Sequence, residues 1–242
     1  MSVDKKRKAL VVGASGGIAT AIIHHLVDQD YHVYAVSRSS TPSLKHDHLK
    51  WYSCDYTDTA ISSVCEQLSE VIPELNTIYL CNGILHGEEI RPEKQLTQLT
   101  SDAFLQVLQV NTLLPMRWIQ NLHRFLNRQQ DITLVVFSAR VGSIEDNGLG
   151  GWYSYRASKA ALNMLLKTYS VELQRKHPKA SILIFHPGTT DTELSKPFQK
   201  NVPDGKLFTA DFVAHQLFEL VQREDRTQPI AYLDWQGKTI PW

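Results

Sequence analysis

The glycine-rich segment Gly13-Ala14-Ser15-Gly16-Gly17-Ile18-Ala19 constrains the fold of this chain more than any other feature. It follows a short apolar run over residues 8–12 and precedes apolar residues at helical spacing, so it is predicted to join a strand to a helix. Such a turn lets the backbone approach a pyrophosphate and directs the helix N–H groups at its charge. At the first strand–helix junction it predicts a dinucleotide-binding fold, with a tight turn that binds nothing as the alternative. The residues expected to contact the dinucleotide are Gly13, Ser15, Gly17 and Ile18.

The rest of the chain alternates short β-branched runs with longer segments of helical period. This alternation predicts a Rossmann-type doubly wound parallel sheet with helices on both faces. No repeat or linker interrupts the pattern and residues 187–205 are interpreted as a loop, so residues 1–242 are predicted to form one domain. Pro115 is expected to kink the helix that contains it. Strands are predicted over residues 8–12, 31–37, 49–54, 77–81, 132–138, 181–186 and 230–233, and helices after the glycine-rich turn and over residues 58–72, 101–126, 154–177 and 210–222.

Charge and cysteine content exclude several classes of protein. Lys plus Arg and Asp plus Glu each number 25, so the chain lacks the basic surplus of a nucleic-acid binder. No apolar stretch reaches the ~20 residues that span a bilayer. Cys54, Cys65 and Cys81 leave one thiol unpaired and lack the spacing of a metal site, as in proteins of a reducing compartment. We therefore expect a cytoplasmic protein with no metal, no nucleic-acid partner and no membrane partner.

Two charged residues follow the second and third predicted strands. An enzyme that selects NAD usually has an acidic residue after the second strand, where it binds the ribose 2′-hydroxyl. This chain has Arg38 there, whose planar guanidinium suits a 2′-phosphate, so NADP(H) is the predicted cofactor; the alternative is a solvated surface arginine. Asp55 is expected to accept a hydrogen bond from the adenine amino group. Alternatively it caps the next helix, for which Thr57 or Asp58 is better placed.

Tyr155 and Lys159 stand four residues apart, on one face of a predicted helix. A free phenol has a pKa of about 10 and ionises poorly at neutral pH. A cation one helical turn away stabilises the phenolate and lowers that pKa, and a shift of three units requires roughly 4 kcal/mol of differential interaction. Together with the glycine-rich turn, this pair indicates a tyrosine that exchanges a proton with a substrate.

The chain resembles the short-chain dehydrogenase/reductase family over nearly its whole length, from Gly13 to Trp242. The resemblance is carried by a glycine turn, an active-site Asn, a Tyr-x-x-x-Lys pair and a Pro-Gly-x-x-x-Thr segment. These motifs match Gly13, Gly17 and Ala19; Asn111; Tyr155 and Lys159; and Pro187, Gly188 and Thr192. Within the family, residues 83–86, 141–144, 151–156 and 234–242 are similar to the C-factor (C-signal) and carbonyl-reductase-like branch.

The resemblance implies a reaction and a role for each matched residue. A small-molecule carbonyl is reduced, or an alcohol oxidised, with hydride exchanged with NADP(H) and the proton supplied by Tyr155. Lys159 holds the ribose and tunes Tyr155, and Asn111 anchors a water that restores the proton. A homodimer or homotetramer is also expected. Further contacts to the cofactor are expected from Asn82, Gly83, Pro187, Gly188, Thr190 and Thr192.

One position departs from the family pattern. The family's catalytic serine precedes x-x-Gly after the fifth strand, and here Ala139 occupies its position, with Ser138 one residue earlier. That serine donates to the substrate's carbonyl oxygen, and losing one such donor costs ~3 kcal/mol, or about 10²–10³ in rate. Ser138 is the candidate catalytic serine and Ser143 a second one, although neighbouring strand residues point to opposite sides. A shifted donor, a slow enzyme and a C-factor-like signalling protein that binds NADP(H) without turnover are therefore three alternatives.

Overall fold

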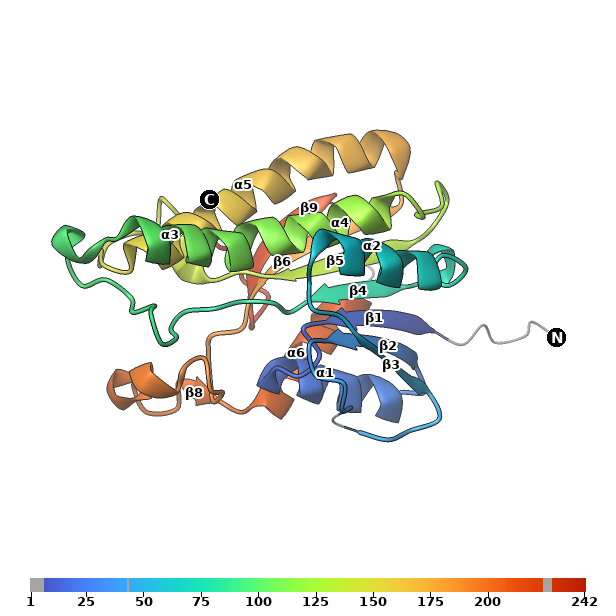
Figure 1. Ribbon diagram of the computed structural model, residues 1–242, viewed down its shortest axis with the longest axis horizontal. Helices are drawn as coiled ribbons and strands as arrows, with labels where there is room; N and C mark the ends of the chain where they lie inside the picture. The colour runs from blue at the N-terminus through green and yellow to red at the C-terminus, as the bar shows by residue number, and fades with distance from the viewer. Residues whose placement is uncertain (1–6, 43, 224–227) are drawn as a thin grey trace.

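The central feature of the computed structural model is a parallel sheet of seven strands (Figure 1). The structure describes residues 7–42, 44–223 and 228–242. In the order in which they pair, the strands are β3 (Leu49–Ser53), β2 (His32–Ser37), β1 (Lys8–Val12), β4 (Thr77–Leu80), β5 (Ile132–Phe137), β6 (Ala180–His186) and β9 (Ile230–Asp234). The α-helices are α1 (Gly17–Asp28), α2 (Asp58–Gln67), α3 (Ser101–Leu108), α4 (Leu114–His123), α5 (Tyr153–Lys176) and α6 (Ala210–Gln222). This arrangement confirms the predicted Rossmann-type doubly wound sheet.

Helices cover both faces of the sheet. Figure 1 shows α1 and α6 on one face and α2, α4 and α5 on the other. Successive residues of β1 alternate between the two cores, since Leu10 and Val12 pack on the α2 side and Ala9 and Val11 on the α1 side. Because both faces of the strand are buried, every position needs an apolar residue, which explains why β1 is an unbroken apolar run in the sequence.

The direction in which the sheet is wound reverses at β1. This strand pairs with β2 on one side and with β4 on the other. In doubly wound sheets, ligands bind beyond the carboxyl ends of the strands at such a switch point. The loops that follow β1, β4, β5 and β6 leave the sheet at this edge, on the left of Figure 1, and they carry the predicted site residues.

The predicted helix over residues 101–126 is divided in the structure. α3 ends at Leu108, a π-helical turn spans Gln109–Leu113, and α4 begins at Leu114 with Pro115 in its first turn. The expected disruption by Pro115 therefore takes the form of a π turn just before it. Proline has no N–H to donate to the preceding turn, and a wider turn accommodates the missing bond. The π turn holds Asn111, which is completely buried.

Two other predictions differ from the structure. The helix predicted over residues 58–72 ends at Gln67, and a separate 3₁₀ turn follows over Ile72–Glu74. Residues 187–205, predicted to be a loop, contain β7 (Thr189–Thr190) and a 3₁₀ helix over Lys196–Asn201, and β7 pairs with β8 (Leu207–Phe208). Strands of two residues have no periodic pattern that a sequence could display. The other predicted elements begin and end within one residue of those observed.

Candidate functional site

The glycine-rich turn forms one wall of the site. Gly13 has φ +82°, which glycine adopts without strain, and a Cβ there would lie 3.1 Å from the backbone nitrogen of Asn82. α1 begins at Gly17 without a side-chain cap, and such a helix end binds anions such as a pyrophosphate. A Cβ on Gly17 would lie 3.0 Å from Cγ2 of Thr192, so the turn approaches the segment that follows β6. Ile18, in the first turn of α1, lines the large cavity described below.

Ser15 and Arg38 lie together at the carboxyl end of β2. The hydroxyl of Ser37, the last residue of β2, donates to Oγ of Ser15 at 2.9 Å. Arg38 is the next residue, and its side chain is exposed. Burial raises the pKa of the nearby Tyr56 phenol, and the Arg38 charge acts in the opposite direction. Arg38 is thus exposed and directly follows a residue that bonds to the glycine-rich turn, where the sequence predicts the 2′-phosphate.

Asp55 does not cap α2 but holds the residue that does. Its Oδ1 accepts hydrogen bonds from the backbone N–H (2.9 Å) and the hydroxyl (2.8 Å) of Thr57, and these bonds lower the pKa of the carboxyl. Oγ1 of Thr57 in turn accepts from the N–H of Ala60 at 3.3 Å, as an N-cap does. Thr57 is therefore the cap, and adenine binding by Asp55 stays a prediction.

Two of the residues predicted to bind the cofactor hold a buried polar atom that has no partner within the described residues. Oδ1 of Asn82 and Oγ1 of Thr190 are enclosed, yet neither takes part in a hydrogen bond. Such atoms in folded proteins are nearly always bonded to protein, water or ligand. Asn82 lies against Gly13, and Thr190 lines the cavity with Pro187, Gly188 and Thr192. One unpaired atom thus lies beside the glycine-rich turn and the other in the cavity wall. Both could form hydrogen bonds with a dinucleotide that extends from the turn into the cavity.

Tyr155 and Lys159 project from the first turns of α5. Lys159 is only 3% exposed; its Nζ donates to the carbonyl of Phe137 at 2.9 Å and lies 5.9 Å from the centre of the Tyr155 ring. Burial lowers the pKa of Lys159 to about 8. Burial raises the pKa of Tyr155, whereas the sequence led us to expect a lowered one. The reason is that desolvation of the phenol dominates, while the ammonium is directed at a backbone carbonyl.

Asn111 joins the catalytic helix to the loop after β4. Its Oδ1 accepts from the N–H of Ile84 (2.7 Å), and its Nδ2 donates to the carbonyl of Ile84 (2.8 Å) and to Oγ of Ser158 (3.1 Å). A Cβ on Gly83 would lie 3.7 Å from Oδ1 of Asn111 and 3.8 Å from Nζ of Lys159. The structure therefore brings Gly83, Asn111 and Lys159 together. Because the Asn111 amide is engaged by protein groups, its water-anchoring role stays a prediction.

The hydroxyl of Ser138 is engaged by a neighbouring side chain, and its catalytic role stays a prediction. This residue lies in the cavity wall, but its hydroxyl donates to Oδ1 of Asn163 at 2.7 Å and has no second hydrogen to donate to a substrate. The hydroxyl of Ser143 donates to the carbonyl oxygen of Trp242 at 3.3 Å. Ala139 instead forms a small apolar cluster with Tyr155 and Leu85. The alternation of side chains along the strand end explains this outcome, because it separates Ser138 from the position of Ala139.

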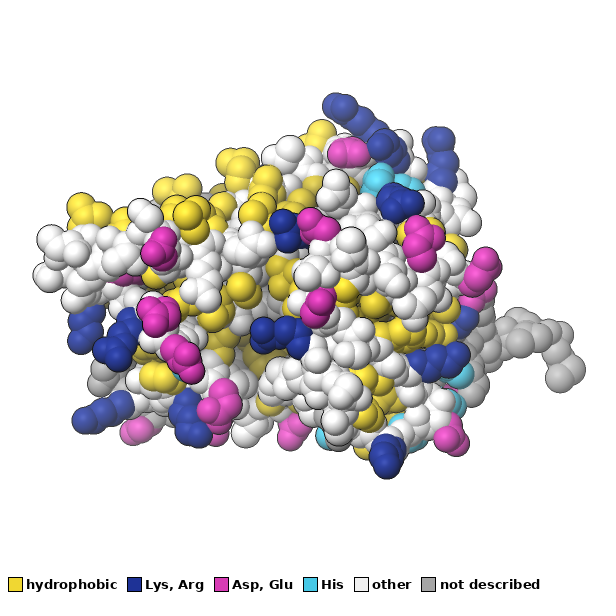
Figure 2. Space-filling model, viewed as in Figure 1, with side chains coloured by type: hydrophobic (Ala, Val, Ile, Leu, Met, Phe, Trp, Pro, Cys, Tyr) yellow, Lys and Arg dark blue, Asp and Glu magenta, His cyan; other side chains and the backbone are white. Residues whose placement is uncertain are grey.

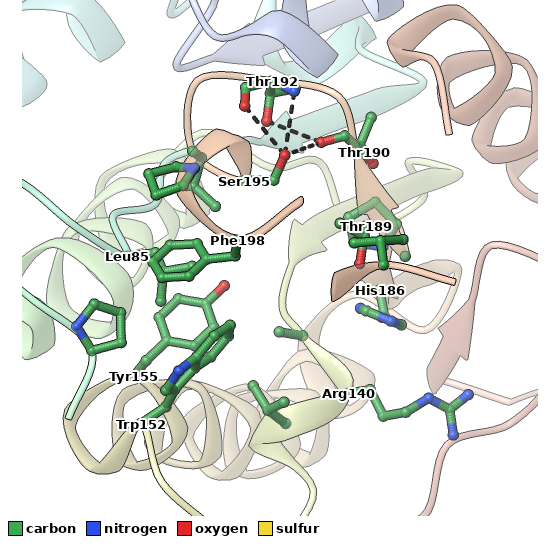
Figure 3. A pocket seen from close by; sticks show the side chains of 18 of the residues that line it. Leu85, Arg140, Trp152, Tyr155, His186, Thr189, Thr190, Thr192, Ser195 and Phe198 are labelled. Carbon is green, nitrogen blue, oxygen red and sulfur yellow. Dashed lines mark hydrogen bonds between the residues drawn. The ribbon is translucent and has the colours of Figure 1, made fainter. Parts of the chain in front are cut away.

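Tyr155 faces a cavity of about 780 Å³ with two unlike walls. Figure 3 shows Leu85, Trp152, Tyr155 and Phe198 on one side and His186, Thr189 and Arg140 on the other. The Trp152 ring centre lies 5.2 Å from that of Phe198 and 6.1 Å from that of Tyr155. Cavities of this size and mainly apolar character bind small organic molecules. The site can therefore hold an organic substrate beside the Tyr155 hydroxyl.

Glu93 is a site residue that no pattern in the sequence indicates. α5 begins after Trp152, whose φ is +53° and whose side chain forms no cap. Glu93 takes over that role: its carboxylate accepts the N–H of Ser154 (3.2 Å) and the Ser154 hydroxyl, and its carbonyl accepts the N–H of Trp152 (2.5 Å). Glu93 is 3% exposed and lies 61 residues from Ser154 in the sequence. Only the tertiary structure reveals that it holds the start of the helix that carries Tyr155.

Comparison with known proteins places this geometry in a family. The short chain dehydrogenase family matches residues 7–203. 1-Hydroxy-2-glutathionyl-2-methyl-3-butene dehydrogenase of Rhodococcus sp. strain AD45 is 32% identical over 191 residues, 78% of this chain and 80% of that protein. Benzil reductase ((S)-benzoin forming) of Bacillus subtilis is 24% identical over 88% of this chain and 93% of that protein. C-signal of Myxococcus xanthus is 32% identical over 43% of this chain and 58% of that protein.

Solved structures share the fold. A short-chain dehydrogenase/reductase from Burkholderia multivorans with bound NADP has a TM-score of 0.84 at 22% identity, covering 98% of this chain and all of that one (100%). The carbonyl reductase Sniffer of D. melanogaster has a TM-score of 0.83 at 20% identity, with the same coverage of 98% and 100%. The family match and the Rhodococcus relative confirm the predicted family, and C-signal is among the similar proteins. The chain therefore belongs to the short-chain dehydrogenase family of oxidoreductases.

Proposed function

We propose that this protein is an NADP(H)-dependent oxidoreductase that interconverts a carbonyl and an alcohol, with Tyr155 as the proton donor. The observation that carries the proposal is the placement of Tyr155 in the wall of a mainly apolar cavity, with the buried ammonium of Lys159 one helical turn away. Benzil reductase and Sniffer, both carbonyl reductases by name, are similar to the chain. The exposed Arg38 and the NADP bound in the B. multivorans structure support NADP(H) rather than NAD(H).

The chain's own residues perform the proton chemistry. When bound, the reduced nicotinamide supplies a hydride to the carbonyl carbon. Tyr155 donates its phenolic proton to the carbonyl oxygen, so an alcohol and a phenolate form, and the positive charge of Lys159 stabilises that phenolate. A proton from solvent then restores the phenol. Asn82, Thr190 and the glycine-rich turn are the residues proposed to hold the cofactor, because their unpaired groups fit it.

Lys159 sets an expected upper pH limit for carbonyl reduction. Burial lowers the pKa of its ammonium to about 8, so the charge is present below that pH and is lost as pH rises through it. Burial also raises the pKa of Tyr155, which stays protonated over the same range. The kcat at saturating NADPH should therefore be level near neutral pH and decline about tenfold per unit well above 8.

The matched variant for this pH profile is Lys159→Arg, because a guanidinium keeps its charge at every pH of the assay. Its kcat should be lower overall, since Arg fits the buried position less well, but the decline above about 8 should be absent. An identical alkaline limb in both proteins would show that another group titrates there.

A second candidate function is that of a C-signal-like protein that binds NADP(H) with no turnover. It is favoured by Ala139, which leaves Tyr155 without a neighbouring serine hydroxyl, and by the similarity to C-signal. Calorimetric titration with NADPH and a carbonyl panel that includes benzil separate the two candidates. Carbonyl-dependent NADPH oxidation supports the enzyme, whereas micromolar NADPH binding with no oxidation across the panel would overturn it.

We also propose a homodimer or homotetramer that covers the face formed by α3 and α5. Figure 2 shows hydrophobic side chains along the upper edge of the molecule, over these helices. Apolar side chains exposed there include Leu105 (61%), Met164 (65%) and Val171 (52%). Sedimentation at micromolar concentration should give a multiple of 27.5 kDa, and Met164→Glu should weaken association at least about tenfold by burying an unpaired charge. A wild-type protein that sediments only at 27.5 kDa would contradict the proposal.

A cytoplasmic location is the remaining part of the proposal. Among the described residues, no helix has both the length and the apolar character needed to cross a membrane. Within those same residues, no three His, Cys, Asp or Glu side chains gather in a way that could hold a metal. Cys54, Cys65 and Cys81 are free thiols. We propose a cytoplasmic location on the basis of these free thiols, which a reducing compartment preserves.

A further inference from the structure

Tyr155 supplies only one hydrogen bond to the oxygen of a carbonyl that is being reduced. Negative charge develops on the carbonyl oxygen as the hydride arrives, and donors preorganised around that oxygen stabilise it. Tyr155 supplies one hydrogen. The position beside it holds Ala139, which has none to give, and the hydroxyls of Ser138 and Ser143 donate to Asn163 and Trp242. A second donor would have to come from another wall of the cavity.

His186 is placed to meet this need. It is the last residue of β6, which pairs with β5 in a register that opposes Phe185 to Phe137. The N–H of Ser138 still bonds to the carbonyl of Phe185 (2.9 Å), so the pairing continues to the end of both strands. Both His186 and Ala139 line the cavity at these strand ends, and Tyr155 lies in the wall that faces His186 (Figure 3).

The imidazole of His186 lacks a hydrogen-bond partner of its own. Nδ1 is buried and makes no hydrogen bond among the described residues. Arg140, on the same wall, is engaged by neighbours, since it pairs with Asp146 and Asp234 at 3.2 and 3.0 Å. Buried polar atoms are rarely left unpaired, and His186 lines the cavity, so a molecule bound there is a candidate partner for its imidazole.

The charge state of His186 suits this role. Burial, reinforced by the charge of Arg140 and partly opposed by that of Asp234, lowers the pKa of the imidazole to about 4. The ring is therefore neutral at physiological pH, and one of its nitrogens carries a hydrogen that can be donated. A neutral donor stabilises developing negative charge without introducing a second cation beside Lys159.

We propose that His186 donates the second hydrogen bond to the substrate's carbonyl oxygen, in place of the hydroxyl that Ala139 lacks. The inference rests on the proposed carbonyl reduction and identifies a further catalytic residue for it. It also limits the substrate class. The carbonyl must reach between Tyr155 and His186 while an aromatic or other apolar substituent packs against Trp152 and Phe198, as in aryl ketones and aryl diketones.

The test compares kcat for benzil reduction in a set of variants at saturating NADPH. His186→Leu removes the donor and should lower kcat about 10²-fold, with the Kd for NADPH and the Tm unchanged. His186→Gln keeps an N–H donor and should retain most of the activity. His24→Leu, at an exposed histidine of α1, is the matched control and should behave as wild type.

Rescue by Ala139→Ser separates catalysis from a merely structural role. If the two side chains supply the same hydrogen bond, the serine should restore at least about tenfold in the His186→Leu background and add about threefold or less to wild type. Equal gains in both backgrounds, or a His186→Leu protein with wild-type kcat, would overturn the role of His186 and leave the proposed function intact. No turnover in any variant, Ala139→Ser included, would overturn both.

Discussion

Tyr155→Phe is expected to lower carbonyl-dependent NADPH oxidation about 10³-fold while NADPH still binds. The variant removes the only group that the proposed chemistry uses as a proton donor, and general acid catalysis of this kind contributes roughly 10²–10⁴. The ring itself should remain in place. It packs in the cluster of Leu85 and Ala139, and no hydrogen bond of the phenol to a described residue would be lost. The Tm should therefore change little.

The matched control is Tyr153→Phe, which removes a phenol two residues away in the same turn of α5. Tyr153 is 38% exposed and does not line the cavity, so this variant should retain wild-type kcat. The measurements are steady-state NADPH oxidation with benzil and a fluorescence titration of NADPH. Unchanged turnover in Tyr155→Phe would show that the proton comes from elsewhere, and the mechanism would be wrong.

The fold was predictable because its signals are local. The glycine-rich turn predicts the first strand–helix junction, and the buried runs around it can lie only in a sheet covered on both faces. Tyr155 and Lys159 could be paired from sequence for the same reason, since helical geometry alone puts them on one face. The spacing rule says nothing about their environment, and so the raised pKa of Tyr155 was not expected: desolvation depends on which distant segments cover the ring.

The residues that sequence reasoning missed act across long separations. Glu93 binds the start of α5 from 61 residues away, and His186 lines the same cavity as Ala139 only because β5 and β6 pair. Ser138 shows that closeness in sequence can also mislead. A serine one position from the expected one is close in sequence, but its hydroxyl donates to Asn163, so sequence proximity does not substitute for direction. Identifying donors at this site requires the hydrogen-bond partners of each side chain.

Arg38→Asp is expected to abolish the preference for NADPH over NADH. The Kd for NADPH should rise at least about 10²-fold, while the Kd for NADH changes only a few-fold. The exposed guanidinium follows β2 directly, where a 2′-phosphate would accept charge-assisted hydrogen bonds from its planar fork. The substitution removes those bonds and adds a like charge, which repels the phosphate. NADH has a 2′-hydroxyl instead, to which an aspartate can bond.

A control must separate this local effect from a general change of charge. Lys45→Asp alters the net charge by the same amount at another exposed residue of the β2–β3 connection, so it should weaken NADPH binding by little and leave the ratio of the two Kd values unchanged. Because exposed charges are screened by salt, the loss in Arg38→Asp should shrink as ionic strength rises. Equal losses for NADPH and NADH would show that Arg38 does not read the 2′-phosphate, and cofactor selection would then have to come from another part of the site.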